Sequence, residues 1–295
     1  MINPEPIIQK TEYRGNHLYL LREDLIPYAL GGSKVRIALA HMEHLRSRGF
    51  TSLIVYGKVT SNLVRAAASL CASSGIPCHV IYRIDPGDRT ESFNRTIAEK
   101  YASRIYFCTG ENVAVTVGQA LRDAENAGEV PYYIYGDIYG NGNEEISIDA
   151  YRSVGKELRG FEERNGETFD FLFCPAGTCV TFTGLMSGHA RFGQTTYVAV
   201  SVARSAERIQ KDILRFTGGK IDASRYSILP PGDDSSFIPE IYRQYGLALD
   251  PVYTAKAFSA MDGYISSHQL EGRRILFVHT GSTPLHFDYL CDTCK

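Results

Sequence analysis

The sequence predicts an α/β protein with two domains, each a mostly parallel twisted sheet flanked by helices. Three observations predict this class. Short apolar runs rich in β-branched and aromatic residues alternate with amphipathic helical patterns along almost all of the 295 residues. The connections between them are short, as expected for right-handed βαβ crossovers. There are also too many such units for one sheet of ordinary size, which favours two sheets with a cleft between them.

The individual elements follow from local patterns. Predicted strands are apolar runs bounded by turn residues, and they cover 17–24, 51–57, 77–84, 104–108, 131–138, 168–176, 195–203 and 273–281. In the predicted helices apolar residues recur three or four positions apart, as Val35, Leu39 and Met42 do, and a glycine such as Gly49 often follows. These helices cover 35–49, 63–75, 91–103, 112–128, 144–166, 181–193 and 206–216.

Composition and charge exclude several classes of protein. The 31 Lys and Arg residues against 33 Asp and Glu give a net charge of -2, which argues against a nucleic-acid binder. No apolar run reaches the length of about 18 residues that a membrane-spanning helix needs. The N-terminal segment contains Glu, Pro and Asn where a secretion signal would have a basic end and an apolar core. We therefore expect a cytoplasmic protein that binds neither nucleic acid nor membrane.

We interpret the cysteines and histidines as structural residues rather than as catalytic residues or metal ligands. Seven cysteines in a long chain without a secretion signal predict reduced thiols. Cys291 and Cys294 form a C-x-x-C pair, but a zinc site needs about four ligands and no second pair or histidine lies nearby, so no metal is expected. His41 and His44 lie on a predicted helix and are expected to be solvated, whereas His279 is expected to have a structural role.

The segment around Lys34 is the first that suggests chemistry. Lys34 follows two glycines and opens a predicted helix. The segment is not a nucleotide-binding P-loop, because Ser33 stands where the second glycine of that motif belongs. The positive end of the helix dipole disfavours the ammonium form, and a partly deprotonated lysine can form a Schiff base. An ordinary solvated lysine is the alternative.

Two further segments suggest anion binding. Thr60, Ser61 and Asn62 cap the next predicted helix, so hydroxyl, amide and backbone N–H donors converge at a position suited to a carboxylate. Residues 177–181 follow a strand, and their N–H groups with the hydroxyls of two threonines could cradle a phosphate. Plain helix capping and an ordinary strand-to-helix turn are the alternatives.

Taken together and in this order, the three segments resemble the fold-type II pyridoxal-phosphate enzymes. More narrowly they are similar to the D-cysteine desulfhydrase and 1-aminocyclopropane-1-carboxylate (ACC) deaminase family. The family's opening motifs match residues 22–25 and 31–36, and its Ser-Asn run matches residues 60–68. Its phosphate loop matches residues 177–181, and its D-P-V-Y-x-G-K-A-M block matches residues 250–265. Its last strand and glycine turn match residues 275–284. The resemblance spans nearly the whole chain.

The resemblance implies pyridoxal 5'-phosphate as cofactor, bound in the interdomain cleft, and a homodimer. It implies a larger cofactor-binding domain of residues 1–40 and 145–295, and a smaller α/β domain of residues 41–144. The catalytic residues would be Lys34 and Tyr253, and Lys34 would hold the cofactor covalently. The cofactor would be bound by Lys34, Asn62, Gly177, Thr178, Cys179, Val180, Thr181 and Thr254. The substrate would be bound by Thr60, Ser61, Asn62 and Tyr253.

The position of Thr254 implies the type of reaction. In ACC deaminases a glutamate stands there, facing the pyridine nitrogen, whereas desulfhydrase-like members carry a threonine. A hydroxyl cannot protonate that nitrogen as a carboxyl group can, which favours β-elimination from a small amino acid to give a 2-oxo acid and ammonia. ACC-type ring opening, a β-replacement synthase and a non-catalytic cofactor-binding relative remain open alternatives. Departures from the family pattern at Ser33, Thr60 and Leu63 leave the substrate and its chirality open.

Overall fold

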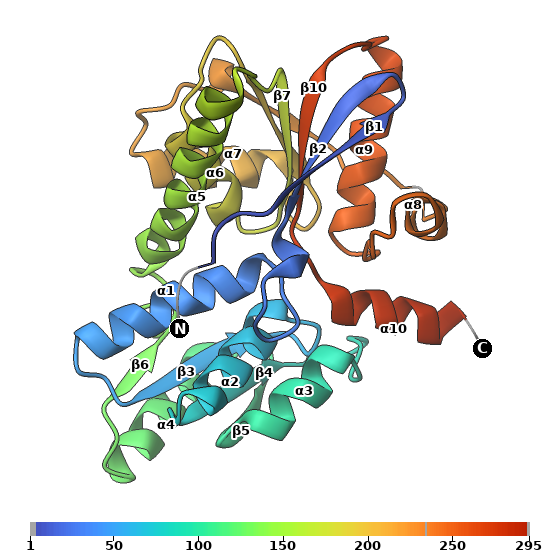
Figure 1. The fold of residues 1–295 in the computed structure, drawn as a ribbon. Helices are drawn as coiled ribbons and strands as arrows, with labels where there is room; N and C mark the ends of the chain where they lie inside the picture. The colour runs from blue at the N-terminus through green and yellow to red at the C-terminus, as the bar shows by residue number, and fades with distance from the viewer. Residues whose placement is uncertain (1–3, 234, 294–295) are drawn as a thin grey trace.

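The computed structural model describes residues 4–233 and 235–293, which contain two β-sheets (Figure 1). The first has the strand order β1-β2-β10-β7-β8-β9, and the second has the order β5-β4-β3-β6. Every pair is parallel except β1 with β2. The first sheet consists of β1 (Ile8–Tyr13), β2 (Asn16–Arg22), β10 (Arg274–His279), β7 (Phe171–Ala176), β8 (Thr196–Ser201) and β9 (Tyr226–Leu229). The second consists of β5 (Arg104–Cys108), β4 (Cys78–Arg83), β3 (Ser52–Gly57) and β6 (Pro131–Tyr133).

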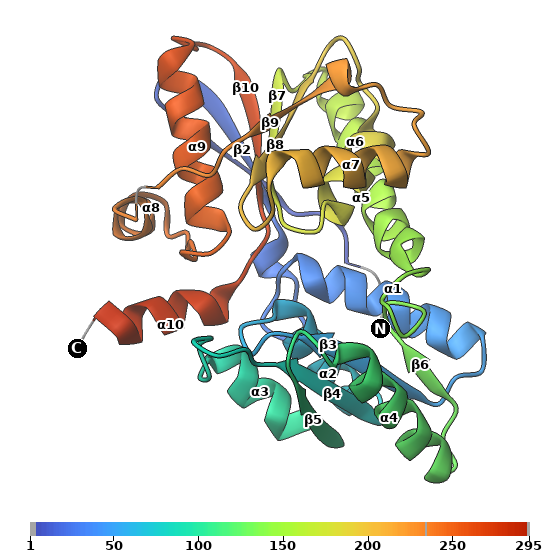
Figure 2. The same ribbon diagram turned by 180° about the vertical axis from the view of Figure 1, so that it is seen from behind.

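Helices connect the strands and cover the sheets. Around the first sheet, α5, α6 and α7 lie on one side, and α8 and α9 lie on the other (Figures 1 and 2). The α-helices are α1 (Ser33–Ser47), α2 (Asn62–Ser73), α3 (Phe93–Tyr101), α4 (Val113–Asn126), α5 (Glu144–Asn165), α6 (Val180–His189), α7 (Ala206–Thr217), α8 (Phe237–Tyr245), α9 (Thr254–Ser267) and α10 (Thr283–Thr293). Two short 3-10 helices are η1 (Glu23–Leu25) and η2 (Ala223–Arg225).

The strands of the first sheet are apolar on both faces because helices cover both. In β10, Leu276 and Val278 pack into the core beneath α5, α6 and α7, whereas Ile275 and Phe277 pack into the core beneath α8 and α9. Side chains alternate between the two faces of a strand, so a strand buried on both faces reads as a continuous apolar run. The run RILFVH in β10 is of this kind, and it lies centrally in the sheet.

Helices α5 and α6 approach each other closely because glycines face the contact. A methyl group added at Gly188 would lie 2.1 Å from the carbonyl oxygen of Arg152. A methyl group at Gly155 would lie 2.5 Å from the carbonyl oxygen of Leu185. Neither position has room for a larger residue without moving a backbone. The contact therefore fixes the position of α6 relative to α5.

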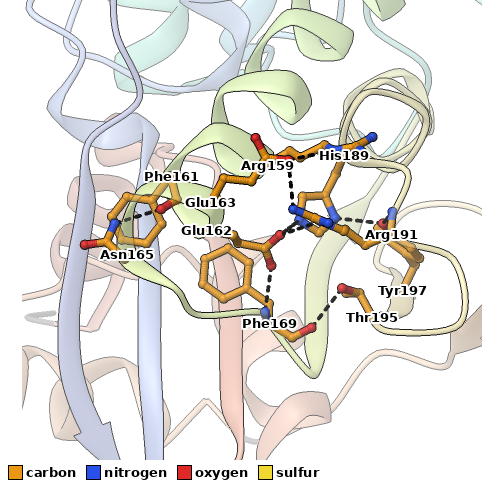
Figure 3. A network of polar contacts seen from close by, with 10 residues as sticks. All are labelled: Arg159, Phe161, Glu162, Glu163, Asn165, Phe169, His189, Arg191, Thr195 and Tyr197. Atoms are coloured by element: carbon orange, nitrogen blue, oxygen red, sulfur yellow. Dashed lines mark hydrogen bonds and ion pairs between the residues drawn. The ribbon is translucent and has the colours of Figure 1, made fainter.

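A buried polar network holds the far end of α6 (Figure 3). The fully buried carboxylate of Glu162 accepts the backbone N–H of Phe169 at 2.7 Å and the Arg191 Nε–H at 3.2 Å. The Nε2 atom of His189, the last residue of α6, lies 2.9 Å from the same carboxylate. The His189 Nδ1 atom is 2.7 Å from the Tyr197 hydroxyl. These contacts tie the end of α6 to the end of α5 and to strand β8.

The predicted α/β class is confirmed, and the structure also contains several elements that were not predicted. Strands β1 and β9 and helices α8, α9 and α10 were not among the predicted elements. The strand predicted over 131–138 ends at Tyr133, because the chain turns at Gly136, which has a φ of 100°. The second sheet lies within residues 52–133, and the domain limits given above stay a prediction.

Three smaller expectations concern cysteines, a histidine and membranes. In the described part of the chain, Cys71, Cys78, Cys108, Cys174, Cys179 and Cys291 are free thiols, and Cys294 lies outside that part. The expectation that His41 is solvated is wrong, since its ring is buried between the Tyr132 hydroxyl and the Ser147 hydroxyl. Across residues 4–233 and 235–293, no helix has the length and apolarity that crossing a bilayer demands.

Candidate active site

A cavity of about 440 Å³ is bordered by loops from both sheets. From the second sheet come the loops that follow β3 and β6, and from the first sheet come those that follow β7, β8 and β10. In parallel α/β sheets, the loops at the carboxyl ends of strands are where ligands bind. The predicted site residues that border this cavity are Lys34, Ser61, Asn62, Gly177, Thr178, Cys179, Val180, Thr181 and Tyr253. Thr60 and Thr254 do not border it.

Lys34 lies in the first turn of α1, one residue after two glycines in positive-φ conformations. Gly31 is required there, because a methyl group would lie 2.1 Å from the carbonyl oxygen of Asp24. Burial, together with a smaller effect of the positive charge of Arg204, lowers the pKa of the Lys34 amine to about 8. A substantial fraction of this amine is therefore neutral near physiological pH and able to act as a nucleophile or base.

The start of α2 brings Ser61 and Asn62 to the cavity. Ser61 is the N-cap of α2, where its hydroxyl accepts the backbone N–H of Val64 at 3.3 Å. The Asn62 Nδ2 group donates to the Ser282 hydroxyl at 2.6 Å. The carbonyl oxygen of Thr60 accepts a hydrogen bond from Asn94. Thr60 itself does not border the cavity. Leu63 borders the cavity beside this pair and adds an apolar surface.

The predicted anion cradle is the loop between β7 and α6. Cys179, the N-cap of α6, has a φ of 64°, and this left-handed conformation is adopted by few residues other than glycine. A residue in that conformation at a helix start turns successive N–H groups toward one point, which suits a phosphate. The Cys179 thiol is buried in the core and burial raises its pKa to about 12, so only the backbone of this residue serves an anion.

Tyr253 and Thr254 begin α9 and face different surroundings. Tyr253 borders the cavity, and its ring lies near Gly177, where an added methyl group would come within 3.6 Å. Burial, together with a smaller effect of the Asp250 charge, raises the pKa of the Tyr253 hydroxyl to about 12. Thr254 is fully buried, and its hydroxyl donates to the Asp250 carboxylate at 2.7 Å. The Thr254 hydroxyl is thus engaged by Asp250, and Thr254 does not border the cavity that Tyr253 borders.

Sequence reasoning assigned no role to several residues that border the cavity. Thr280 and Ser282 follow β10 and lie in the segment HTGSTP, which we compared with the family's last strand and glycine turn. Arg204 follows β8, and its guanidinium pairs with the buried carboxylate of Asp212. Thr280 could have been predicted as a site residue from its place at the carboxyl end of a parallel strand. No local pattern distinguished Arg204 from the other arginines of α7 and its preceding loop.

A family model described as "Pyridoxal-phosphate dependent enzyme" matches residues 2–225. The chain belongs to this family. It is 27% identical to a D-cysteine desulfhydrase of Yersinia enterocolitica over 97% of this chain and 92% of that protein. It is 26% identical to a D-cysteine desulfhydrase of Klebsiella pneumoniae over 95% of this chain and 90% of that protein.

Solved structures share the fold. The structure of an ACC deaminase homologue aligns with 100% of this chain and with 94% of its own chain. The TM-score is 0.78 and the sequence identity is 20%. The structure of a hydrogen sulfide-producing enzyme from Fusobacterium nucleatum aligns with 95% of this chain and with 96% of its own chain. The TM-score is 0.71 and the sequence identity is 18%. At such identities these structures show a common fold alone. They confirm the predicted fold class, and the family match confirms the predicted cofactor and an enzyme that depends on pyridoxal phosphate.

Proposed function

We propose that this protein eliminates a β-substituent, in the simplest case a thiol, from a small amino acid. For cysteine, cleavage of the Cβ–S bond and uptake of one water molecule would give hydrogen sulfide, pyruvate and ammonia. The observation that carries the proposal is the environment of Lys34. A lysine amine with a pKa of about 8 opens into a cavity between the N-terminus of α6 and the Ser61–Asn62 start of α2. D-cysteine desulfhydrase relatives that align over nearly the whole chain support the elimination.

The residues around the cavity fit the cofactor. Pyridoxal phosphate, when bound, supplies the electron sink that stabilises negative charge at the substrate Cα atom. In our proposal the Lys34 Nζ atom holds the aldehyde carbon, and the N–H groups of residues 177–181 bind the phosphate. The left-handed conformation of Cys179 supports that second assignment. The Asn62 amide would bind the ring hydroxyl, and Thr280 rather than Thr254 would offer a hydroxyl to the ring nitrogen, because only Thr280 borders the cavity.

Two side chains would move protons. Lys34 would accept the proton from the substrate Cα atom at Nζ, since its lowered pKa leaves a neutral fraction at physiological pH. Tyr253 would donate to the leaving group, because its raised pKa keeps the hydroxyl protonated. The different environments of the two groups thus provide a base and an acid in one cavity.

The start of α2 would receive the substrate carboxylate. Ser61 and Asn62 present polar side chains beside the free N–H groups of the helix terminus, which favours an anion. The substrate role predicted for Thr60 would act through its backbone, since its side chain does not border the cavity. Leu63 leaves one wall of this subsite apolar, which favours a small substituent.

Ring opening of ACC has less support in the cavity. Glu144 is the only carboxylate among the described residues that border the cavity, and it pairs with Arg215 at 2.8 Å. A β-replacement synthase would differ only in the nucleophile that follows elimination. Adding thiols or amines to the elimination assay and looking for new amino acids would distinguish that activity.

The proposal is tested with purified protein and added pyridoxal phosphate. We expect an absorption band that borohydride bleaches, with the reduced cofactor attached to the peptide that contains Lys34. Lys34→Ala should lose the attachment and the release of 2-oxo acid from D- or L-cysteine. Lys58→Ala should keep both, because Lys58 is exposed and pairs with Asp88. Turnover by Lys34→Ala, or attachment at another lysine, would contradict the assignment.

We also infer a homodimer acting in the cytoplasm. The basis is the resemblance to the D-cysteine desulfhydrase and ACC deaminase family. The molar mass of the holoenzyme in solution, measured by light scattering, tests the first part. A mass of one 32.8 kDa chain would contradict it.

A further inference from the structure

Arg65 on α2 is a buried cation without a carboxylate partner. Its side chain is fully buried, and within residues 4–233 and 235–293 it forms no ion pair. The Nη2 group donates to the carbonyl oxygen of Gly31 at 3.1 Å, and the Nε–H donates to Asn94 Oδ1 at 2.8 Å. Its Nη1 group is buried without a hydrogen-bond partner. A charge so placed is costly unless an anion compensates it.

Arg65 determines how the Asn94 side chain is oriented. A guanidinium can only donate, so the Asn94 atom that faces it must be the oxygen. The Nδ2 group of Asn94 then points the other way, where it donates to the carbonyl oxygen of Thr60 at 2.9 Å and to Asn62 Oδ1 at 3.1 Å. A backbone carbonyl can only accept, so two independent partners require the same orientation.

Asn94 in turn determines the orientation of Asn62. Because Asn62 Oδ1 accepts from Asn94, the Asn62 Nδ2 group is directed to the opposite side, toward Ser282. Asn62 and Ser282 both border the cavity. The hydrogen bonds therefore run in one direction, from the Arg65 cation through two amides to an N–H donor at the cavity wall.

We propose that Arg65 and Asn94 are positioning residues that hold the Asn62 amide with its N–H group toward the cavity, and that the anion compensating Arg65 is the ring oxygen of the bound cofactor. This inference rests on the proposed function. Hydrogen bonds in a chain polarise one another, so positive charge behind Asn94 strengthens the donor at the far end. An anionic acceptor gains most from such a donor.

The test uses Asn94→Asp, which keeps the shape of the side chain. A carboxylate beside Arg65 supplies the missing counter-ion but has no N–H to donate to Asn62. We expect the apo protein to keep or raise its thermal unfolding midpoint. We expect the dissociation constant for pyridoxal phosphate to rise about 10- to 100-fold, the range that corresponds to loss of a hydrogen bond to a charged group. The bound cofactor's absorption should also shift toward the form with a protonated ring oxygen.

Two other variants complete the comparison. Asn94→Ala removes the whole link and should produce the same spectral shift with lower stability. Asn112→Asp is the matched control: Asn112 precedes α4, and its side-chain oxygen accepts the backbone N–H of Thr109 at 2.8 Å, a bond that a carboxylate retains. It should leave affinity and spectrum unchanged.

The outcomes separate this inference from the proposed function. If the wild-type protein binds no cofactor at Lys34, the proposed function fails. If the wild-type protein binds the cofactor while a folded Asn94→Asp variant keeps its affinity and spectrum, the positioning role fails and the proposed function stands. A lower stability with an unchanged spectrum would likewise show that Arg65 and Asn94 serve the fold alone.

Discussion

The Thr254 hydroxyl donates to the Asp250 carboxylate at 2.7 Å, and both side chains are completely buried at the start of α9. The same carboxylate accepts the backbone N–H groups of Val252, Tyr253 and Thr254. Asp250 thereby caps α9 and sets the direction in which Tyr253 enters the cavity. Threonine at position 254 thus has a structural function that resemblance to a family alone does not reveal.

Substitution of Thr254 and of Thr280 should have different consequences. Thr254→Val removes one donor to the Asp250 carboxylate and leaves the buried backbone N–H of Asp250 without its acceptor, so we expect a loss of about 1–3 kcal/mol in the free energy of unfolding. Its cofactor spectrum should match the wild type. Thr280→Val should leave stability nearly unchanged and alter the spectrum and affinity of the cofactor. Urea unfolding and cofactor titration measure the two effects, and a spectral change in Thr254→Val alone would restore the originally predicted role of Thr254.

Capture of the cofactor by the apo protein should depend on pH through Lys34. The neutral amine is the reactive form, and its pKa is lowered to about 8. We expect the attachment rate, followed by stopped-flow absorbance, to rise with pH and to be half-maximal near pH 8. Arg204→Gln removes a positive charge that lowers this pKa, so its midpoint should move to higher pH. Arg243→Gln on α8 is the control, and a midpoint near that of an ordinary lysine in the wild type would refute the assignment.

The contact between α5 and α6 can be tested by adding one methyl group. In Gly188→Ala the new carbon would meet the carbonyl oxygen of Arg152 at 2.1 Å, so the helices must separate. We expect a loss of roughly 3 kcal/mol in unfolding free energy, together with weaker cofactor binding because α6 carries the anion cradle. Gly263→Ala on α9 meets nothing within 4 Å and should gain about 0.5–1 kcal/mol from reduced backbone entropy. Equal stability of the two variants would be inconsistent with this packing.

Two neighbouring glutamates allow a matched test of the network in Figure 3. Glu162→Gln removes a buried charge that faces His189 and Arg191, and we expect a loss of roughly 3 kcal/mol in unfolding free energy. Glu163→Gln alters an exposed ion pair with Arg191 and should change stability by less than about 0.5 kcal/mol. Denaturant titrations of both variants at neutral pH give the comparison. Similar losses in both would mean that burial of Glu162 has no energetic role.

Periodicity predicted most of the fold because most elements are buried and regular. The parallel strands read as continuous apolar runs, and the helices between them repeat at three- and four-residue spacing. Helix α9 also carries such spacing, in Ala257, Phe258, Met261 and Ile265, which are all buried. It was nevertheless not assigned as a helix, because the segment had been interpreted as a family motif. Strand β1 is an edge strand in which only Tyr13 is buried, so its pattern is weak.

The site was predictable to the extent that it lies at strand ends. We predicted Lys34, Ser61, Asn62 and the loop 177–181 because glycines, caps and small polar residues mark strand-to-helix turns, and all of them border the cavity. His41 shows the limit of this reasoning. It lies in a helix that is buried on more than one side, and its hydrogen bonds to Tyr132 and Ser147 come from distant parts of the sequence. No local pattern reveals partners about a hundred residues away.

The path of the polypeptide between the two sheets has one more consequence. In the described chain it leaves the first sheet through α1 and returns through α5 (Figure 1). Lys34 therefore lies in one of the two bridges that join the halves of the molecule. A hinge rotation of one half against the other would move this bridge. It would therefore change the distance from Lys34 to the loops on either side. Closure around a substrate and alignment of the amine would then be a single motion.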